Sequence, residues 1–158
     1  MWPEPVERVA RELRAAAVEA TIQEFPETTA TAEAAARAIG CALDQVLKSV
    51  VFVCDSRTVL ALVPGDRRAD EAKVAAAAGA DAARVAYARE VVAATGFEPG
   101  AVAPFRLPAI DVVLLEQSAL THPRVWIGAG TAAHMAGLAP AELQRLTGAR
   151  AADLVAPR

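Results

Sequence analysis

The sequence predicts one α+β domain over residues 1–158, in which a mixed, curved β-sheet is flanked by short helices. Three observations indicate this fold class. Apolar runs of strand length alternate irregularly with helical patterns, two pairs of runs are joined by short turns, and no repeat or linker divides the chain. The 158 residues are 54% hydrophobic and 22% charged, a composition that can bury one core.

The first forty residues predict two helices with a short strand between them. Residues 5–20 place apolar side chains at helical spacing between Glu and Arg, so we expect an amphipathic helix. Residues 21–25 follow as a strand. A second helix is expected between Thr31, which can cap its first turn, and Gly40, which can end it.

The rest of the chain predicts two hairpins, three helices and two further strands. Apolar runs over 46–53 and 58–63, separated by CDSR, form the first hairpin, with its turn near Asp55 and Ser56. Similar signals then predict, in chain order, a turn at Pro64 and Gly65, a helix from Asp70 to Gly79, a brief strand and a helix over 83–96, an irregular loop over 96–108, a strand over 109–117, a hairpin over 124–137 turning at Gly128 to Gly130, a helix over 140–148 and a strand over 152–155.

Charge and composition exclude several classes of protein. The formal net charge is -3, without the basic surplus of a protein that grips a long nucleic acid, so we expect no DNA binding and only a short, local RNA contact. No apolar stretch approaches the roughly 20 residues of a membrane span, and the N-terminal segment has no apolar signal core. With two cysteines, a reduced cytoplasmic protein is expected.

The sequence shows no motif of the usual catalytic constellations, although a Ser-His-Asp arrangement stays open. The two histidines, His122 and His134, form no metal-ligand spacing with cysteine, and no G-x-S-x-G motif occurs. GAGT, starting at Gly128, lacks the third glycine of a dinucleotide loop and indicates a tight turn instead. Cys54 is expected to be a small buried filler. We therefore expect no metal and no cofactor.

Lys48 is the unusual residue of the first hairpin, because it interrupts the apolar run VLKSVVFV. One interpretation is a lysine at a sheet edge, with its stem packed on neighbours and its ammonium in water. The other is a lysine held by a rigid strand in a cleft, where it orients a phosphate or stabilises an oxyanion. Spacing alone does not choose between them.

The loop GAVAP gives a second hint of a site. Gly100 and Pro104 enclose three small apolar residues, so backbone N–H groups can approach an anion or a ribose closely. A plain Pro-rich surface loop is the alternative.

Taken together, these segments resemble a known family. The order TAEAAARAIG, QVLKSVVFV, LALVPGDRRAD, TGFEPGAVAPF and LAPAELQRLTGARAADL, spanning about residues 5–155, is similar to the YbaK/ProX family of trans-editing aminoacyl-tRNA deacylases. These proteins are free-standing relatives of the editing domain of bacterial prolyl-tRNA synthetase. The resemblance implies barrel-like curvature of the sheet. It also implies hydrolysis of the ester of a mischarged tRNA, most often tRNA-Pro carrying Ala, Cys or another small amino acid.

The resemblance also assigns site residues and partners. It implies that Lys48 is the required lysine of the family. The G-x-x-x-P loop that receives the terminal adenosine corresponds to Gly100, Ala101, Val102, Ala103 and Pro104, and the glycine-containing turn to Gly128, Ala129 and Gly130. The expected partners are the 3′ acceptor end of a mischarged tRNA and prolyl-tRNA synthetase, with no membrane.

Several alternatives stay open at this point. His134, on the strand after the turn, faces either the pocket or the core. Arg67, Arg68 and Lys73 form either a phosphate patch or a solvated helix face. The whole protein could be a binding module for a tRNA end that is docked on a synthetase, or an enzyme that uses Lys48 as a Schiff base.

Overall fold

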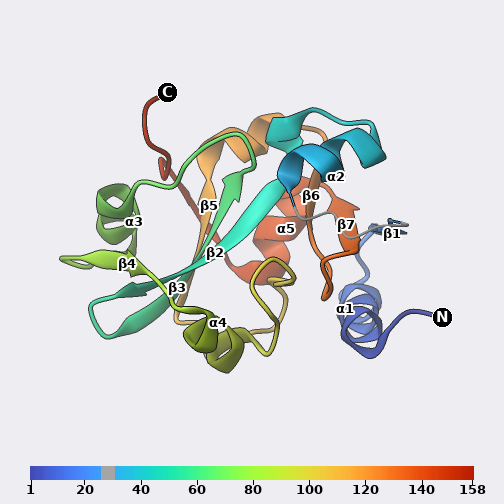
Figure 1. Cartoon of the computed structure of the whole chain (residues 1–158), viewed down its shortest axis with the longest axis horizontal. Coiled ribbons are helices and arrows are strands. Elements are labelled where there is room, and N and C mark those ends of the chain that lie inside the picture. Colours follow the sequence, from blue (N-terminus) through green and yellow to red (C-terminus); the bar gives the residue numbers. More distant parts are fainter. Residues whose placement is uncertain (26–30) are drawn as a thin grey trace.

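The structure, a computed structural model shown in Figure 1, describes residues 1–25 and 31–158. Its strands form a three-stranded sheet in the order β1-β7-β6 and a five-stranded sheet in the order β4-β2-β3-β5-β8. In chain order the helices and strands are α1 (Glu4–Ala15), β1 (Thr21–Glu24), α2 (Ala32–Ile39), β2 (Leu47–Cys54), β3 (Arg57–Pro64), α3 (Glu71–Ala78), β4 (Ala83–Val85), α4 (Ala88–Thr95), β5 (Val112–Glu116), β6 (Val125–Gly128), β7 (His134–Leu138), α5 (Pro140–Thr147) and β8 (Arg150–Ala152), with short 3-10 turns at Leu43–Gln45 and Gln117–Thr121.

The larger sheet is mixed, as predicted. β2 pairs antiparallel with β3 and β4, whereas β3 with β5 and β5 with β8 pair in parallel. β6 and β7 form the second predicted hairpin, and β1 adds to its outer edge. A bridge between Val46 and Trp126 connects the two sheets, but the described strands of each sheet run from edge to edge without closing. The α+β class is therefore confirmed, while barrel-like closure stays a prediction.

β3 lies at the centre of the core and is buried on both faces. Leu60 and Leu62 contribute to one apolar cluster, and the alternating residues Val59, Ala61 and Val63 contribute to another. The first cluster fills the space between the two sheets, α1 and α5, and the second lies under α3, where Cys54 is a buried filler as expected. Figure 1 shows α3 and α1 at opposite ends of the molecule.

The helices of the described residues are short, and α1, with 12 residues, is the longest. Thr31 caps α2 by accepting a hydrogen bond from the N–H of Ala34, and Gly40 ends that helix in the left-handed conformation. Asp70 caps α3 in the same way. Within residues 1–25 and 31–158, no helix has the length and apolar character needed to cross a bilayer.

Three predicted boundaries are wrong, and one of them is the start of β5, which begins at Val112 rather than at residue 109. α1 ends at Ala15 rather than near residue 20, because Ala17 adopts a positive φ of 57° and Val18 folds back to donate to the carbonyl of Leu13. The last strand is β8, three residues long, rather than 152–155. The N–H of Leu154 donates to Oε1 of Glu116 at 3.0 Å instead of to a neighbouring strand, so residue 154 lies outside the sheet.

Candidate functional site

A cavity of about 310 Å³ opens between the start of α2, the start of β2, the loop around Gly100 and the β6–β7 hairpin. Half of the ten residues that the sequence suggests for the site line this cavity, namely Lys48, Gly100, Val102, Gly128 and His134. They come from three segments that are far apart in the sequence. The fold therefore brings the predicted lysine, loop and turn to one pocket.

Lys48 combines the two interpretations that its sequence allows. Strand alternation places it on the face opposite Leu47, so its side chain is exposed and the expected burial of the whole run is wrong at this position. β4 pairs with β2 only from Phe52 onward, so β2 is an edge at Lys48. Nζ nevertheless has a fixed partner, because it donates to the carbonyl oxygen of Arg67 at 2.9 Å. The ammonium of Lys48 is thus fixed in position at the wall of the pocket.

The carbonyl that holds Lys48 is itself braced by residues 153–158. The guanidinium of Arg67 donates to the carbonyl of Ala156 at 2.7 Å, and the N–H of Ala156 donates to the carbonyl of Arg68 at 2.8 Å. Arg158 pairs with Asp66 at 3.0 Å. The loop after β3 is therefore fixed from both sides.

Arg67, Arg68 and Lys73 lie beside the pocket but do not form one free cationic patch. Arg67 is bound to Ala156, and Lys73 pairs with Asp153 at 2.9 Å, which lowers the pKa of that carboxyl. Arg68 is exposed. Arg67 and Arg68 line a broader groove of about 960 Å³ that shares Lys48 with the pocket.

The GAVAP loop divides into residues at the pocket and residues behind it. Gly100, with a φ of 88°, and Val102 line the cavity. Ala101 is buried, and its N–H and carbonyl are taken by Glu98 and Gly130. Ala103 and Pro104 are also buried and are not among the lining residues. In the described part of the chain, the N–H groups of Gly100 and Val102 have no protein acceptor.

The glycine-containing turn fixes the loop to the second hairpin. The N–H of Gly130 donates to the carbonyl of Ala101 at 3.0 Å, and the N–H of Ala129 donates to the carbonyl of His134 at 3.1 Å. A Cβ on Gly128 would lie 2.7 Å from the carbonyl oxygen of Val102. Only glycine allows this approach. Gly128 thus lines the pocket, while Ala129 and Gly130 hold it together.

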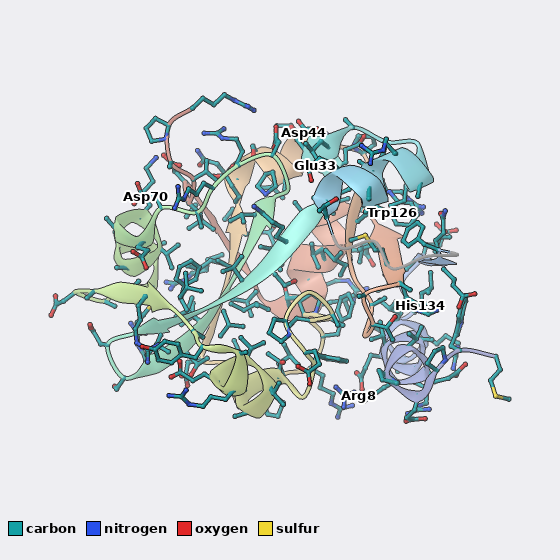
Figure 2. All side chains as sticks on the ribbon, in the orientation of Figure 1. Arg8, Glu33, Asp44, Asp70, Trp126 and His134 are labelled. Atoms are coloured by element: carbon teal, nitrogen blue, oxygen red, sulfur yellow. The ribbon has the colours of Figure 1, made fainter. Side chains whose placement is uncertain are left out.

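His134 lines the pocket although it is 3% exposed. Its Nδ1 lies 2.6 Å from Oγ1 of Thr131, which also accepts the N–H of Ala133. Its Nε2 lies 3.2 Å from Oε2 of Glu24, but the two groups are not aligned for a hydrogen bond. The ring of Trp2 packs edge-on against the imidazole, and Figure 2 shows His134 on the side of the molecule where β7 and α1 lie.

The sequence reasoning missed three polar residues of the pocket, Thr31, Ser49 and Thr131. Ser49 could have been noticed, because it is the second polar residue in the apolar run of β2. Thr131 stands three residues before His134, but nothing in that spacing signals contact across a turn. Thr31 was recognised only as a helix cap.

The pocket offers hydrogen-bond donors and a positive charge at its wall. The ammonium of Lys48 and the free N–H groups of Gly100 and Val102 suit a carbonyl oxygen, an oxyanion or a phosphate. The apolar side chains around them suit a small group rather than a large one.

Comparisons with known proteins point to one family. The profile of the aminoacyl-tRNA editing domain family matches residues 26–146. A proline–tRNA ligase of Xanthomonas oryzae pv. oryzae is 34% identical over 126 residues, which are 79% of this chain but 22% of the ligase. The uncharacterized protein YwhH of Bacillus subtilis is 32% identical over 80% of both chains. A solved structure described as "a putative trans-editing enzyme for prolyl tRNA synthetase" superposes with a TM-score of 0.88 at 32% identity, covering 99% of this chain and 100% of that one.

Proposed function

The chain belongs to the aminoacyl-tRNA editing domain family, and from this premise we propose that it is an aminoacyl-tRNA deacylase acting in trans. The proposed substrate is a mischarged tRNA, namely tRNA-Pro that carries Ala, Cys or another small amino acid. Water cleaves the ester between this amino acid and the terminal ribose. Because the chain matches only a fifth of the ligase, the activity of the whole ligase is not carried over to it.

One observation carries the proposal: the pocket brings the exposed, anchored ammonium of Lys48 together with the loop at Gly100 and the turn at Gly128. An aminoacyl ester is already activated, so positioning and stabilisation of a tetrahedral oxyanion suffice for hydrolysis. The pocket supplies such donors, and the proposal requires no protein nucleophile.

In the mechanism that we propose, each group has a separate task. The ammonium of Lys48 donates to the developing oxyanion or to the adjacent phosphate, and the N–H groups of Gly100 and Val102 orient the terminal ribose. A water molecule adds to the ester carbonyl. The bond between the acyl carbon and the ribose oxygen then breaks, and the ribose oxygen takes up the proton that the attacking water has lost. A vicinal ribose hydroxyl assists in activating the water.

Selectivity follows from the size of the pocket. One methylene in an apolar pocket changes binding by only about 1–3 kcal/mol, so steric exclusion of the pyrrolidine ring of the correct proline is the more effective device. With a net charge of -3, the protein contacts mainly the acceptor end of the tRNA. In this proposal the protein acts in the cytoplasm, with prolyl-tRNA synthetase as its partner.

A binding module without hydrolytic activity is the second candidate. The observation that favours it is the hydrogen bond from Lys48 to the carbonyl of Arg67, which pairs the ammonium with a protein group. Such a module would bind the aminoacyl end of a tRNA and deliver it to a synthetase.

The test is deacylation of tRNA-Pro charged with Ala, Cys, Ser, Thr or Pro, by the wild type and by Lys48→Ala. We expect the wild type to remove at least one wrong amino acid selectively and Lys48→Ala to lose this activity. Tight tRNA binding with no hydrolysis across the panel would instead identify the binding module. Equal hydrolysis by a folded Lys48→Ala protein would refute the role of the lysine.

A further inference from the structure

Two buried polar atoms at the pocket have no hydrogen-bond partner within the described residues: Oγ of Ser49 and Nε2 of His134. Buried polar side-chain atoms in folded proteins are nearly always paired, so each exception needs an explanation. Nε2 of His134 at least has the carboxylate of Glu24 nearby, at 3.2 Å. The hydroxyl of Ser49 has no recorded polar contact.

Ser49 faces the interior of the molecule rather than its surface. It alternates with Lys48 along β2 and shares its face with Leu47 and Val51, both of which belong to the core between the two sheets. The ammonium of Lys48 therefore lies on the outer face of β2. The hydroxyl of Ser49 enters the same pocket from the inner face.

Within the described part of the chain, no residue of the cavity pairs with this hydroxyl, although Thr31 and Thr131 also line the cavity. Val46, Val102 and Met135 line the same cavity with apolar side chains, and each of them is buried. A substrate group that ends in a methyl would leave Oγ of Ser49 unpaired. A group that ends in a hydroxyl would both donate to Oγ and accept from it.

We propose that the pocket selects aminoacyl groups with a small hydroxylated side chain, seryl or threonyl, and that Ser49 is the residue that recognises the hydroxyl. This inference rests on the proposed deacylase function and narrows its substrate class. The ester lies at the wall that carries Lys48 and Gly100, and the side chain of the amino acid extends inward to Ser49.

The first test compares seryl-tRNA-Pro with 2-aminobutyryl-tRNA-Pro, because these amino acids differ only by a hydroxyl in place of a methyl. We expect kcat/KM of the wild type to favour the seryl ester by about tenfold, the effect of one hydrogen bond. Ser49→Ala should abolish this preference, and Ser49→Thr, which keeps the hydroxyl, should retain it. Ser118→Ala, in the 3-10 turn after β5, is the control and should keep both activity and preference.

A binding measurement separates this inference from the deacylase proposal. The probes are non-hydrolysable amides, 3′-seryl-amino and 3′-aminobutyryl-amino derivatives of 3′-deoxyadenosine, titrated against wild type and Ser49→Ala. Tighter binding of the seryl amide, lost in Ser49→Ala, supports the inference even if no ester is hydrolysed. Equal binding of both amides by the wild type overturns it. An equal loss for both amides in Ser49→Ala also overturns it and assigns Ser49 to the α-amino group.

Discussion

The pocket has two walls that are built in different ways. The first wall is β2 with Lys48, a strand that pairs along its whole length with β3 and whose lysine is anchored to the loop after β3. The second wall consists of the loop at Gly100 and the β6–β7 turn, where the backbone hydrogen bond from Gly130 to Ala101 and close packing at Gly128 fix the geometry. The first wall presents a positively charged side chain to the pocket, whereas the second wall presents backbone groups.

Substitutions in the two walls should therefore have different effects. A change of a side chain on the first wall should affect chemistry and leave the fold intact, since Lys48 is exposed. A change at Gly128 or at the buried Ala101 and Ala129 of the second wall should affect stability and activity together, because these residues are also packing contacts. The predictions below test this contrast.

The largest effect is expected for Lys48→Met, which keeps the stem and removes the charge. Deacylation should fall by about 100-fold or more, the effect of losing a positioned charged donor, while Tm stays the same because an exposed ammonium contributes little to stability. The matched control is Lys73→Met, which also loses a bond to a backbone carbonyl but lies outside the pocket. A parallel drop in Tm of Lys48→Met would show that the first wall is not independent of the fold.

Gly128→Ala should break the second wall. Its new Cβ would meet the carbonyl of Val102 at 2.7 Å, so the loop must shift, at a cost of about 1–3 kcal/mol in the free energy of unfolding. We expect activity to fall as well. Gly40→Ala is the control: it has a positive φ of 81° and open space, so it should lose about 1 kcal/mol from strain and keep its activity. The free energy of unfolding in urea and the deacylation rate are measured on the same preparations. An unchanged rate in Gly128→Ala would contradict the expected coupling of stability and activity in the second wall.

Arg67→Ala should loosen the anchor of Lys48 without removing it. Since the guanidinium bonds to Ala156, its loss frees the carbonyl that orients Nζ, and we expect kcat to fall about threefold to tenfold with KM unchanged. Arg68→Ala, the exposed neighbour, is the control. If Arg67 contacts phosphate instead, KM will rise and the salt dependence of binding will weaken.

Thr131→Val should affect the second wall mildly. It removes the hydroxyl that pairs with Nδ1 of His134 and accepts the N–H of Ala133, at a cost of about 1 kcal/mol or somewhat more. Thr121→Val, which removes an exposed hydroxyl bond in the 3-10 turn after β5, provides the comparison. A loss of activity beyond 1000-fold with normal stability would contradict this positioning role and point to Thr131 as a nucleophile.

The smallest effect is expected at Glu90, which lies outside both walls. A hydrogen bond from Arg84, with a further one from the N–H of Tyr87, lowers the pKa of this carboxyl to about 2. Its folded pKa lies below its unfolded value, so the stabilisation is present above pH 4.5 and is lost as the pH falls toward 2. Glu90→Gln should therefore show a slightly smaller loss of Tm than wild type between pH 7 and pH 3, with activity unchanged at pH 7. An identical acid transition in both proteins would contradict this account.

Local signals in the sequence predicted most of the fold. Thr31 with Gly40 and Asp70 with Gly79 mark the ends of α2 and α3 because caps and left-handed glycines act within one turn. The end of α1 was missed since Ala17 takes the left-handed conformation without being glycine. β8 was misplaced because a side chain far away in the sequence, Glu116, draws Leu154 out of the sheet.

The site was predictable only where a residue conflicts with its local pattern. Lys48 stands out in an apolar run and Gly100 in an irregular loop, so these positions could be proposed from the residues, whereas Gly128 was proposed only through the family resemblance. The carbonyl of Arg67 that holds Lys48 could not, because every residue has a carbonyl and only the tertiary fold selects one. For the same reason, Ala129 and Gly130 could not be separated from Gly128 before their contacts were known.

The brace around Lys48 has a consequence for synthesis on the ribosome. Arg67 lies 19 residues after Lys48, and Ala156 lies 89 residues after Arg67. β5 and β8 likewise join the sheet only by parallel pairings between distant segments, which form late in folding. A nascent chain that has not yet released residue 156 therefore cannot hold the ammonium in its final position. The growing polypeptide should reach its full activity toward aminoacyl esters only after residue 156 has left the ribosome.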